Sequence, residues 1–504
     1  MLKNFKVILI SFVLGLFITL GMSFYTVHAV PSSKISPVLF KSLSSQKTQD
    51  VLVKLKAQAS LEKAFQLQSK EAKSRFVYNA LRKMALSSQK PLLHYLKSKG
   101  LSFQRFYIVN MVAVKGVTAS VLKELSRRKD VAKIYANTDI LAIPELPTVL
   151  EESPKRTKGV GDNIHFVRAD KVWEELGVRG EGIVVAGQDT GVEWSHPALK
   201  RQYRGFVKDG EVIHDYNWHD AIRKPIQGGS SCGYNSLEPC DDNNHGTHTI
   251  GTIVGDDGKG NQIGMAPKAK WIACRNMDAG VGRPTTYLEC FQFFLAPYPL
   301  GADPFTQGDP AKAPHVMNNS WGCPSSEECE GDVLLDVLKA LKAAGIFVVV
   351  SAGNSGPSCG TIEDTPAWHS ADTFSVGAYD HRKLKIAGFS SRGPSAFDGG
   401  IGPDVVAPGV SIRSSVRGGQ YQKIFWSGTS MAGPHVVGLV ALMWSANPKL
   451  IGHIDETINL ILKTTKPIPS GTCMPDQKPQ VPNNTYGYGV IDAFKAVKAA
   501  LAIK

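Results

Sequence analysis

The fold is indicated by a short glycine-rich stretch, Ser427-Gly-Thr-Ser-Met-Ala-Gly-Pro-His-Val436, and by the apolar helix pattern that follows it. Small residues let the backbone turn sharply before the helix, and Pro434 falls in the first helical turn, where a missing N–H does no harm. Ser430 would then lie beside backbone N–H groups that have no helical partner and can stabilise an oxyanion. The stretch predicts a nucleophilic serine at the start of a helix.

Around this stretch, short β-branched strands such as 182–187 and 345–351 alternate with helical stretches such as 332–343. Apolar runs on both sides of a helix indicate parallel strands that are covered on both faces. The roughly 340 residues from 162 onward fit one large α/β domain.

One segment of this region places a carboxylate at the end of a strand. Gln188-Asp-Thr-Gly191 directly follows the predicted strand 183–186. Open parallel sheets present their reactive side chains at that edge, which makes Asp189 a candidate catalytic residue. Asp before Gly is also an ordinary turn, so this segment alone is weak evidence.

Another segment contains two histidines, in Asn244-His-Gly-Thr-His-Thr249, before an apolar run that is compatible with a helix. Two histidines three residues apart can indicate a metal site, but the Glu of an H-E-x-x-H pattern is absent. We interpret His245 as a general base and His248 as a structural group inside the helix.

Together, Asp189-Thr-Gly, His245-Gly-Thr-His and Gly428-Thr-Ser430-Met-Ala resemble the signatures of the subtilisin-like serine proteases, in that family's order of Asp, His and Ser. The resemblance covers residues 165–495. It implies an α/β fold with a parallel sheet and helices on both faces. It also implies Asp189 as the orienting acid, His245 as the general base and Ser430 as the nucleophile.

The resemblance extends to the residues around the reacting bond. Ser351-Ala-Gly-Asn354 resembles the family's oxyanion segment, which implies that the Asn354 amide and the Ser430 N–H hold the tetrahedral intermediate. Gly-Asn-Ser-Gly is also an ordinary turn, but its position just beyond the predicted strand 346–350 favours the site.

Substrate binding follows from the same comparison. Val316-Met-Asn-Asn-Ser-Trp-Gly322 resembles the strand that hydrogen-bonds an extended peptide, and the resemblance implies four substrate-binding residues: Ser320, Trp321, Gly322 and Gly353. Because the matched segments contain no evident acidic residue, we expect apolar or uncharged side chains to be accepted.

Two other features bear on the branch and on cofactors. Segments such as Asp241-Asp-Asn-Asn-His245 look closest to the bacillopeptidase F branch of the family. The triad chemistry requires no cofactor, whereas relatives often bind structural calcium. The loop 256–261 has oxygen donors for calcium, but an exposed acidic turn explains it equally well, and we assign no calcium ligands.

The region before this domain predicts a second fold. Strand and helix patterns from about residue 50 to 137 follow the order β-α-β-β-α-β, the split βαβ arrangement of ferredoxin-like domains. The resemblance implies a propeptide over 30–155 that assists folding and inhibits the catalytic domain, 156–504, until it is cleaved. Residues 143–161 cannot bury a face and predict either a passive tether or, as we favour, a processing linker.

The N-terminus reads as a signal peptide over residues 1–29, because Lys3 and Lys6 precede an uncharged run that ends near the small-residue motif Val27-His28-Ala29. The run is long enough that an uncleaved membrane anchor is the alternative. All eight cysteines lie beyond residue 230, which suits disulfides in an exported protein, and the short loops predict the pairs Cys232–Cys240 and Cys323–Cys329.

The formal net charge of +13 raises the idea of a nucleic-acid partner, but its distribution argues against one. Residues 30–155 carry 22 basic and 9 acidic side chains, whereas residues 156–504 carry 33 and 35. The basic excess therefore belongs to the predicted propeptide. We expect protein or peptide substrates, the chain's own propeptide as inhibitor, membrane contact only during export, and a monomer.

The sequence thus predicts a secreted serine endopeptidase that is made as a zymogen. A catalytically silent subtilisin-like fold that binds peptides or surfaces is the alternative. Loss of Asp189, His245, Ser430 or Asn354 would favour that alternative, and the sequence retains all four.

Overall fold

The computed structural model describes residues 34–39, 47–142, 159–324, 330–422 and 426–503. The predicted signal peptide with its cleavage motif, and most of the predicted linker, lie outside these residues. In the part of the chain that the structure describes, none of the helices is both long and apolar enough to cross a membrane.

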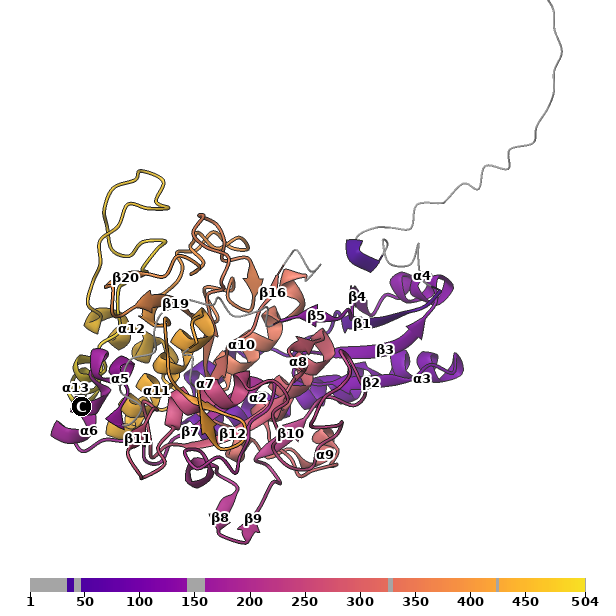
Figure 1. Cartoon of the computed structure of the whole chain (residues 1–504). Helices are drawn as coiled ribbons and strands as arrows, with labels where there is room; N and C mark the ends of the chain where they lie inside the picture. The colour runs from indigo at the N-terminus through magenta and orange to yellow at the C-terminus, as the bar shows by residue number, and fades with distance from the viewer. Residues whose placement is uncertain (1–33, 40–46, 143–158, 325–329, 423–425, 504) are drawn as a thin grey trace, which may run out of the picture.

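An eight-stranded sheet forms the centre of the larger unit, with the strand order β10-β12-β7-β15-β17-β19 and with both β20 and β21 paired to β19 (Figure 1). The strands are β7 (Val184–Asp189), β10 (Trp218–Asp220), β12 (Lys270–Arg275), β15 (Val316–Asn319), β17 (Phe347–Ser351), β19 (Phe374–Asp380), β20 (Lys385–Ile386) and β21 (Val405–Pro408). Every pair is parallel except β19 with β20. The predicted parallel α/β sheet is confirmed.

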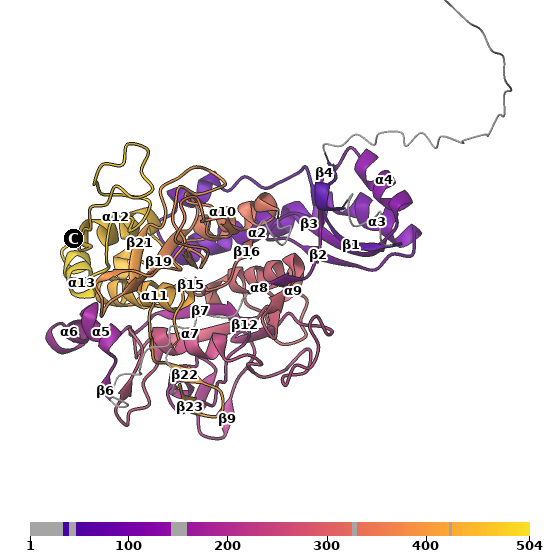
Figure 2. The same ribbon diagram turned by 45° about the horizontal axis from the view of Figure 1, so that its top comes forward.

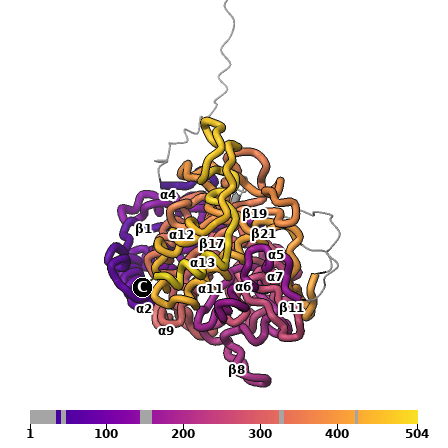
Figure 3. The backbone as a smooth tube through the Cα atoms, turned by 90° about the vertical axis from the view of Figure 1, so that its left-hand side faces the viewer, coloured from indigo at the N-terminus to yellow at the C-terminus, as the bar shows by residue number. Residues whose placement is uncertain are grey.

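Helices cover both faces of this sheet because successive residues of each strand point to opposite sides. Val185 and Val349 pack in one core with α7 (His245–Val254) and α11 (Thr429–Ala446). Ala186 and Val348 pack in another core with α8 (Pro284–Leu295) and α10 (Leu335–Ala343). Figure 3 views the molecule from the side of α11, α12 (Ile454–Thr464) and α13 (Ala493–Leu501).

Residues 49–136 build a separate antiparallel sheet of order β2-β3-β1-β4, shown beside α8 in Figure 2. Its elements are β1 (Gln49–Leu55), η1 (Glu62–Gln66), α2 (Lys70–Ser88), α3 (Lys90–Ser98), β2 (Phe103–Phe106), β3 (Met111–Val117), α4 (Ala119–Arg127) and β4 (Val131–Ala136). This order is the split βαβ arrangement that the sequence predicts. The helical stretch between β1 and β2 divides into α2 and α3 at Gln89, two residues before Pro91. The buried side chain of Gln89 donates to the Phe106 carbonyl (2.8 Å).

Helix α2 packs in a core that the N-terminal unit and the larger unit share. Its buried Val77 and Leu81 pack in the same core as Leu338 of α10. Lys70 Nζ donates to the Ala313 carbonyl (2.9 Å), and Ser74 Oγ donates to the Ala344 carbonyl (2.9 Å). The N-terminal unit is therefore attached to the larger unit by a helix as well as by its sheet.

Among the described residues, the larger unit holds the disulfides Cys232–Cys240, Cys274–Cys290 and Cys359–Cys473. The predicted pair Cys232–Cys240 is confirmed, whereas Cys329 of the other predicted pair lies outside the described residues. The short strands and α-helices of the described residues also include β5 (Ile140–Leu141), β6 (Gly159–Val160), α5 (Asp162–Phe166), α6 (Ala169–Glu175), β8 (Phe206–Lys208), β9 (Glu211–Val212), β11 (Asn261–Gln262), β13 (Met277–Asp278), β14 (Val281–Gly282), α9 (Pro304–Gln307), β16 (Cys323–Pro324), β18 (Asp364–Thr365), β22 (Ser415–Val416) and β23 (Gln420–Tyr421).

Candidate active site

A buried carboxylate and a buried imidazole meet where β7 ends and α7 begins. Asp189 is the last residue of β7, and His245 is the first residue of α7. His245 Nδ1 lies 2.8 Å from Asp189 Oδ1 and 3.0 Å from Oδ2. A carboxylate in this position holds the proton on Nδ1, which leaves Nε2 as the basic nitrogen.

Glycine allows these two elements to approach so closely. A methyl group added at Gly246 would lie 2.0 Å from the Gly191 carbonyl oxygen and 3.1 Å from Asp189 Cβ. Any side chain at Gly246 would therefore force α7 away from the end of β7. The small residue after His245 is therefore required for the close packing of α7 on the end of β7.

His248 lies inside α7 and has a structural role, as the sequence predicts. Its ring stacks on Trp426 with a centroid distance of 4.9 Å, and its Nε2 lies 3.3 Å from the Ile412 carbonyl oxygen. Burial, with a smaller contribution from neighbouring His245, lowers the pKa of His248 to about 3. The ring is therefore neutral at physiological pH.

The sequence reasoning missed Asp241, whose carboxylate bonds to both segments of the candidate site. Its Oδ2 accepts hydrogen bonds from the Thr247 N–H (2.9 Å) and hydroxyl (2.6 Å) in the first turn of α7. Its Oδ1 accepts from the hydroxyl of Thr190 (2.8 Å), the residue after Asp189. A carboxylate just before a predicted helix start could have signalled a cap. Asp241 joins the segment of the acid to the helix of the base.

We expect Asp241→Asn to lower kcat for peptide hydrolysis by about 10- to 100-fold, because an amide N–H₂ would face the Thr247 donors and shift His245 from Asp189. KM should change little. Steady-state kinetics with a peptide substrate would measure both, and circular dichroism would verify the fold. Asp256→Asn, which alters the cap of an exposed loop, is the control. An unchanged kcat in folded Asp241→Asn would contradict the positioning role.

Ser430 is the second residue of α11, and its backbone N–H lies in the turn where helical N–H groups have no intrahelical partner. Its Oγ donates to the carbonyl of Ser320 (3.1 Å), which directly follows β15. His245 Nε2 is buried and makes no hydrogen bond with the described residues. The structure thus assembles the pair of Asp189 and His245 and holds the Ser430 hydroxyl on Ser320.

Asn354 lies beyond the end of β17, as the sequence predicts. Its Oδ1 accepts hydrogen bonds from the backbone N–H and the hydroxyl of Thr429, both at 2.9 Å. Thr429 is the neighbour of Ser430, so the amide is anchored at the start of α11. With Oδ1 engaged, Nδ2 is the end of this amide that can donate to another group.

The four predicted substrate-binding residues lie just beyond the ends of β15 and β17. Ser320 contributes its carbonyl, and Gly353 directly precedes Asn354. The Trp321 side chain is buried and stacks on Tyr287 with a centroid distance of 4.1 Å, so the indole packs in the core. The Gly322 N–H donates to the carbonyl of Ala142 (3.3 Å), at the end of the N-terminal unit.

The segment before Ala142 lies in the site as an extra strand. Leu141 and Ile140 of β5 pair antiparallel with Val281 and Gly282 of β14. The sequence reasoning did not identify β14 as a binding element, because a two-residue strand has no recognisable pattern. Residues 140–142 are therefore held between β14 on one side and Gly322 on the other.

The loop 256–261, for which the sequence allowed either calcium binding or an exposed acidic turn, uses the carboxylate of Asp257 in hydrogen bonds of its own. Asp257 Oδ1 accepts from the N–H groups of Lys259 (2.7 Å) and Asn261 (3.0 Å), and its Oδ2 accepts from the Tyr421 hydroxyl (3.0 Å). The described residues also contain no group of three or more His, Cys, Asp or Glu side chains placed to hold a metal. The contacts of this loop fit an exposed, self-capped turn.

Comparison with known proteins agrees with this geometry. The sequence model of the subtilase family matches residues 180–489. Bacillopeptidase F of Bacillus subtilis (strain 168) is 38% identical over 498 residues, covering 93% of this chain and 32% of that protein. Serine protease AprX of Bacillus subtilis (strain 168) is 28% identical over 418 residues, covering 78% of this chain and 80% of that protein.

A third relative, the thermophilic serine proteinase of Bacillus sp. (strain AK1), is 32% identical over 331 residues, covering 65% of this chain and 64% of that protein. The chain thus spans about a third of the length of Bacillopeptidase F. The family match includes Asp189, His245, Asn354 and Ser430. The chain belongs to the subtilase family of serine proteases.

Proposed function

We propose that this chain is a serine endopeptidase in which Ser430 is the nucleophile, His245 the general base and Asp189 the orienting acid. The buried contact between Asp189 and His245 Nδ1, at 2.8 Å, is the observation that carries the proposal. It fixes the tautomer in which Nε2 can take a proton from a serine hydroxyl. Two of the relatives carry names that describe them as a serine protease and a serine proteinase, which is consistent with this chemistry.

The reaction would proceed through an acyl-enzyme. Ser430 Oγ attacks the scissile carbonyl while His245 Nε2 takes its proton, and the imidazolium then gives this proton to the leaving amine. Water, activated by the same histidine, hydrolyses the ester. The Asn354 Nδ2 and the Ser430 N–H would meet the negative charge that develops on the carbonyl oxygen.

Substrate binding would compete for the group that now holds Ser430. A peptide N–H that reached the Ser320 carbonyl would displace the Ser430 hydroxyl from it and free the hydroxyl for His245. Catalytic hydrogen bonds are often incomplete before substrate binds, so the present position of Ser430 agrees with the proposal.

The N-terminal unit would act as an inhibitory propeptide. Residues 140–142 lie in the site as an extended strand, bonded to Gly322 only two residues from Ser320. An extended substrate would use the same backbone groups, as in other cases where a peptide adds a strand to a sheet edge. While this strand is bound, a substrate cannot occupy the same position.

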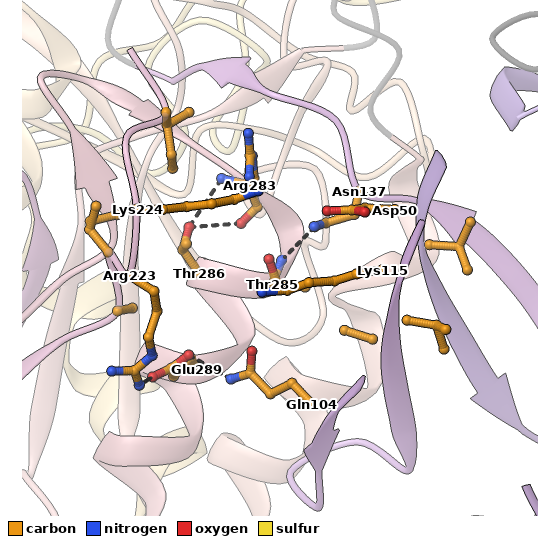
Figure 4. A pocket seen from close by; sticks show the side chains of 16 residues that line it. Asp50, Gln104, Lys115, Asn137, Arg223, Lys224, Arg283, Thr285, Thr286 and Glu289 are labelled. Carbon is orange, nitrogen blue, oxygen red and sulfur yellow. Dashed lines mark hydrogen bonds and ion pairs between the residues drawn. The ribbon is translucent and has the colours of Figure 1, made fainter. Parts of the chain in front are cut away.

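Contacts outside the site hold this unit in place. Figure 4 shows Gln104 of β2 beside Glu289 of α8, and Asn137 beside Thr285. Gln104 Nε2 lies 2.6 Å from Glu289 Oε2, and Asn137 Oδ1 accepts from the Thr285 N–H at 3.1 Å. Two propeptide lysines pair with acids of the larger unit: Lys54 with Asp336 (2.5 Å) and Lys133 with Asp332 (2.9 Å). These pairs fit a basic propeptide on a less basic partner.

The domain division follows from this proposal: a signal peptide (1–29), a propeptide (30–155) and a catalytic domain (156–504). The signal and the disulfides would suit an exported, extracellular enzyme. The enzyme would be a monomer and would act on protein or peptide substrates. It would need no cofactor for these steps.

Self-cleavage tests the proposed function. Wild-type chain expressed in full should break within residues 140–160 and then hydrolyse an unfolded protein, whereas Ser430→Ala should stay full length. Gel electrophoresis with mass spectrometry of the fragments would show both outcomes. If correctly folded wild type stays intact and inert, the proposal fails and a silent peptide-binding fold replaces it.

A further inference from the structure

An open cavity of about 530 Å³ lies where the start of α2 meets the larger unit. One wall is formed by residues 68–71, which lead into the first turn of α2. The opposite wall comes from residues 310–315, just before β15, and from residues 448–451, just after α11. None of the candidate catalytic residues lines this cavity.

Positive side chains dominate the lining. Lys70, Arg204 and Lys449 all line the cavity, and Glu71 is the one acid among the lining residues. The Glu71 carboxylate is already paired with Arg75, at 2.8 Å. Within the described part of the chain, none of the three cations forms an ion pair with a carboxylate. The cavity therefore carries positive charge that its own wall does not neutralise.

Lys70 is placed where a cation is disfavoured. Its side chain is buried, with the residue only 7% exposed, and it begins α2, where the helix dipole favours negative charge. Burial, with further repulsion from Arg204, lowers the pKa of Lys70 to about 7. Its Nζ donates one hydrogen bond, to the Ala313 carbonyl (2.9 Å), and two of the three ammonium N–H groups remain. An anion in the cavity would relieve this burial and this repulsion together.

His315 adds a neutral donor to the opposite wall. Its Nδ1 accepts a hydrogen bond from the Val184 N–H (2.9 Å), so Nδ1 carries no proton. Burial, with repulsion from Lys70 and Arg204, lowers the pKa of His315 to about 3, which keeps the ring neutral. The proton of a neutral ring with this bond lies on Nε2. This N–H has no partner among the described residues.

Arg204 is held in a fixed orientation by neutral oxygens. Its guanidinium donates to the carbonyls of Lys312 (2.8 Å) and Tyr216 and to the side chain of Asn217. These bonds use three of its five N–H groups and leave its charge uncompensated. The first turn of α2 contributes further donors, because the first backbone N–H groups of a helix have no intrahelical partner. Helix N-termini of this kind suit phosphate groups.

We propose that this cavity binds a phosphate group, free or esterified, and that the bound anion links the N-terminal unit to the larger unit. Lys70 and the start of α2 would reach it from one unit, and Arg204, His315 and Lys449 from the other. Donors that converge from several sides match an anion with several oxygens. The candidate catalytic residues take no part, so the proposal goes beyond the peptidase function and does not depend on it.

Calorimetric titration of inorganic phosphate into the full-length Ser430→Ala chain tests the site, since this variant should stay uncut. At constant ionic strength we expect one site with a Kd of about 1 mM or lower. Adding Lys70→Met should weaken binding by about tenfold or more. Lys449→Met, which changes an exposed side chain and should not disturb the fold, should weaken it by about threefold or more. Lys83→Met, at an exposed position of α2 outside the lining, is the matched control and should bind like its parent.

Sulfate provides a pH test, because its charge does not change between pH 6 and 8.5. The anion would bind the protonated form of Lys70, so raising the pH through about 7 should lower sulfate affinity by about tenfold or more. Among the other groups that line the cavity, His315 is already neutral, and burial lowers the pKa of Arg204 only to about 10. Glu71 and Lys449 complete its charged lining. The Lys70→Met variant should therefore lose most of this pH dependence.

Glycerol 3-phosphate separates the two forms of the ligand. Affinity within about tenfold of phosphate supports a site for phosphate esters, for which the open cavity leaves room. Affinity lower by about 100-fold or more supports a site for the free ion. The linking role is measured by hydrogen exchange of α2, which should slow by about tenfold when phosphate is present at ten times its Kd.

Three results would overturn the proposal. The first is the absence of saturable phosphate or sulfate binding by the folded, intact chain at concentrations up to about 20 mM. The second is an unchanged affinity in both Lys70→Met and Lys449→Met. Unchanged exchange of α2 at saturating phosphate would overturn the link between the two units.

Discussion

Replacing Ser430 with alanine is expected to lower kcat for peptide hydrolysis by about 10⁶-fold, the magnitude measured for loss of the nucleophile in subtilisin itself. Ser430 lies at the start of α11, where its hydroxyl donates to the Ser320 carbonyl. The preceding residue, Thr429, donates its backbone N–H to Asn354. No other hydroxyl of the described residues has both of these neighbours. Without the Ser430 hydroxyl the acyl-enzyme cannot form. Steady-state kinetics on the processed enzyme would measure the loss, with the propeptide removed by another protease.

The losses of kcat caused by substituting different residues of the triad should not add up. His245→Ala should cost about as much as Ser430→Ala, and the double variant should be no slower than either, because the residues act as one unit. Ser355→Ala, which alters an exposed serine next to Asn354, is the control. A second, equal drop in the double variant would contradict a shared mechanism.

Replacing Asn354 with alanine should lower kcat by about 10² to 10³, while KM changes little, a range that again comes from subtilisin itself. The amide would act only once negative charge develops on the carbonyl oxygen, so its loss weakens the transition state more than substrate binding. Stopped-flow measurement of acylation would locate the effect in the first chemical step.

An isosteric variant sharpens this prediction. Asn354→Asp keeps an oxygen for the Thr429 donors, bonded at 2.9 Å in the structure, but it removes the N–H₂ that would face the oxyanion. It should therefore lose at least as much activity as alanine while retaining the anchor to Thr429. If Asn354→Asp were as active as wild type, Nδ2 would not be an oxyanion donor.

The N-terminal unit shows where local patterns succeed and where they stop. Its strands and helices were predictable because alternating and helical apolar periods depend on neighbouring residues. The division of the long helical region at Gln89 was not, because the Gln89 side chain bonds to Phe106 across the fold. The burial of α2 against α10 likewise depends on a partner from another part of the chain.

In the larger unit, the sequence by itself determined the parallel α/β sheet and predicted Asp189, His245, Ser430 and Asn354 as the candidate catalytic residues. Each of these residues lies at the end of a strand or the start of a helix, and such positions leave a local signature. Small residues around them marked the close approaches, as at Gly246.

Only the tertiary structure decided three other features: the cap that Asp241 provides, the segment 140–142 between β14 and Gly322, and the position of Asp364 beside Gly322 and Gly353. Each joins segments that no local period connects. The position of Asp364 depends on pairing between β16 and β18, two strands of two residues each. Such pairing is set by the packing of the whole domain rather than by the short sequences involved.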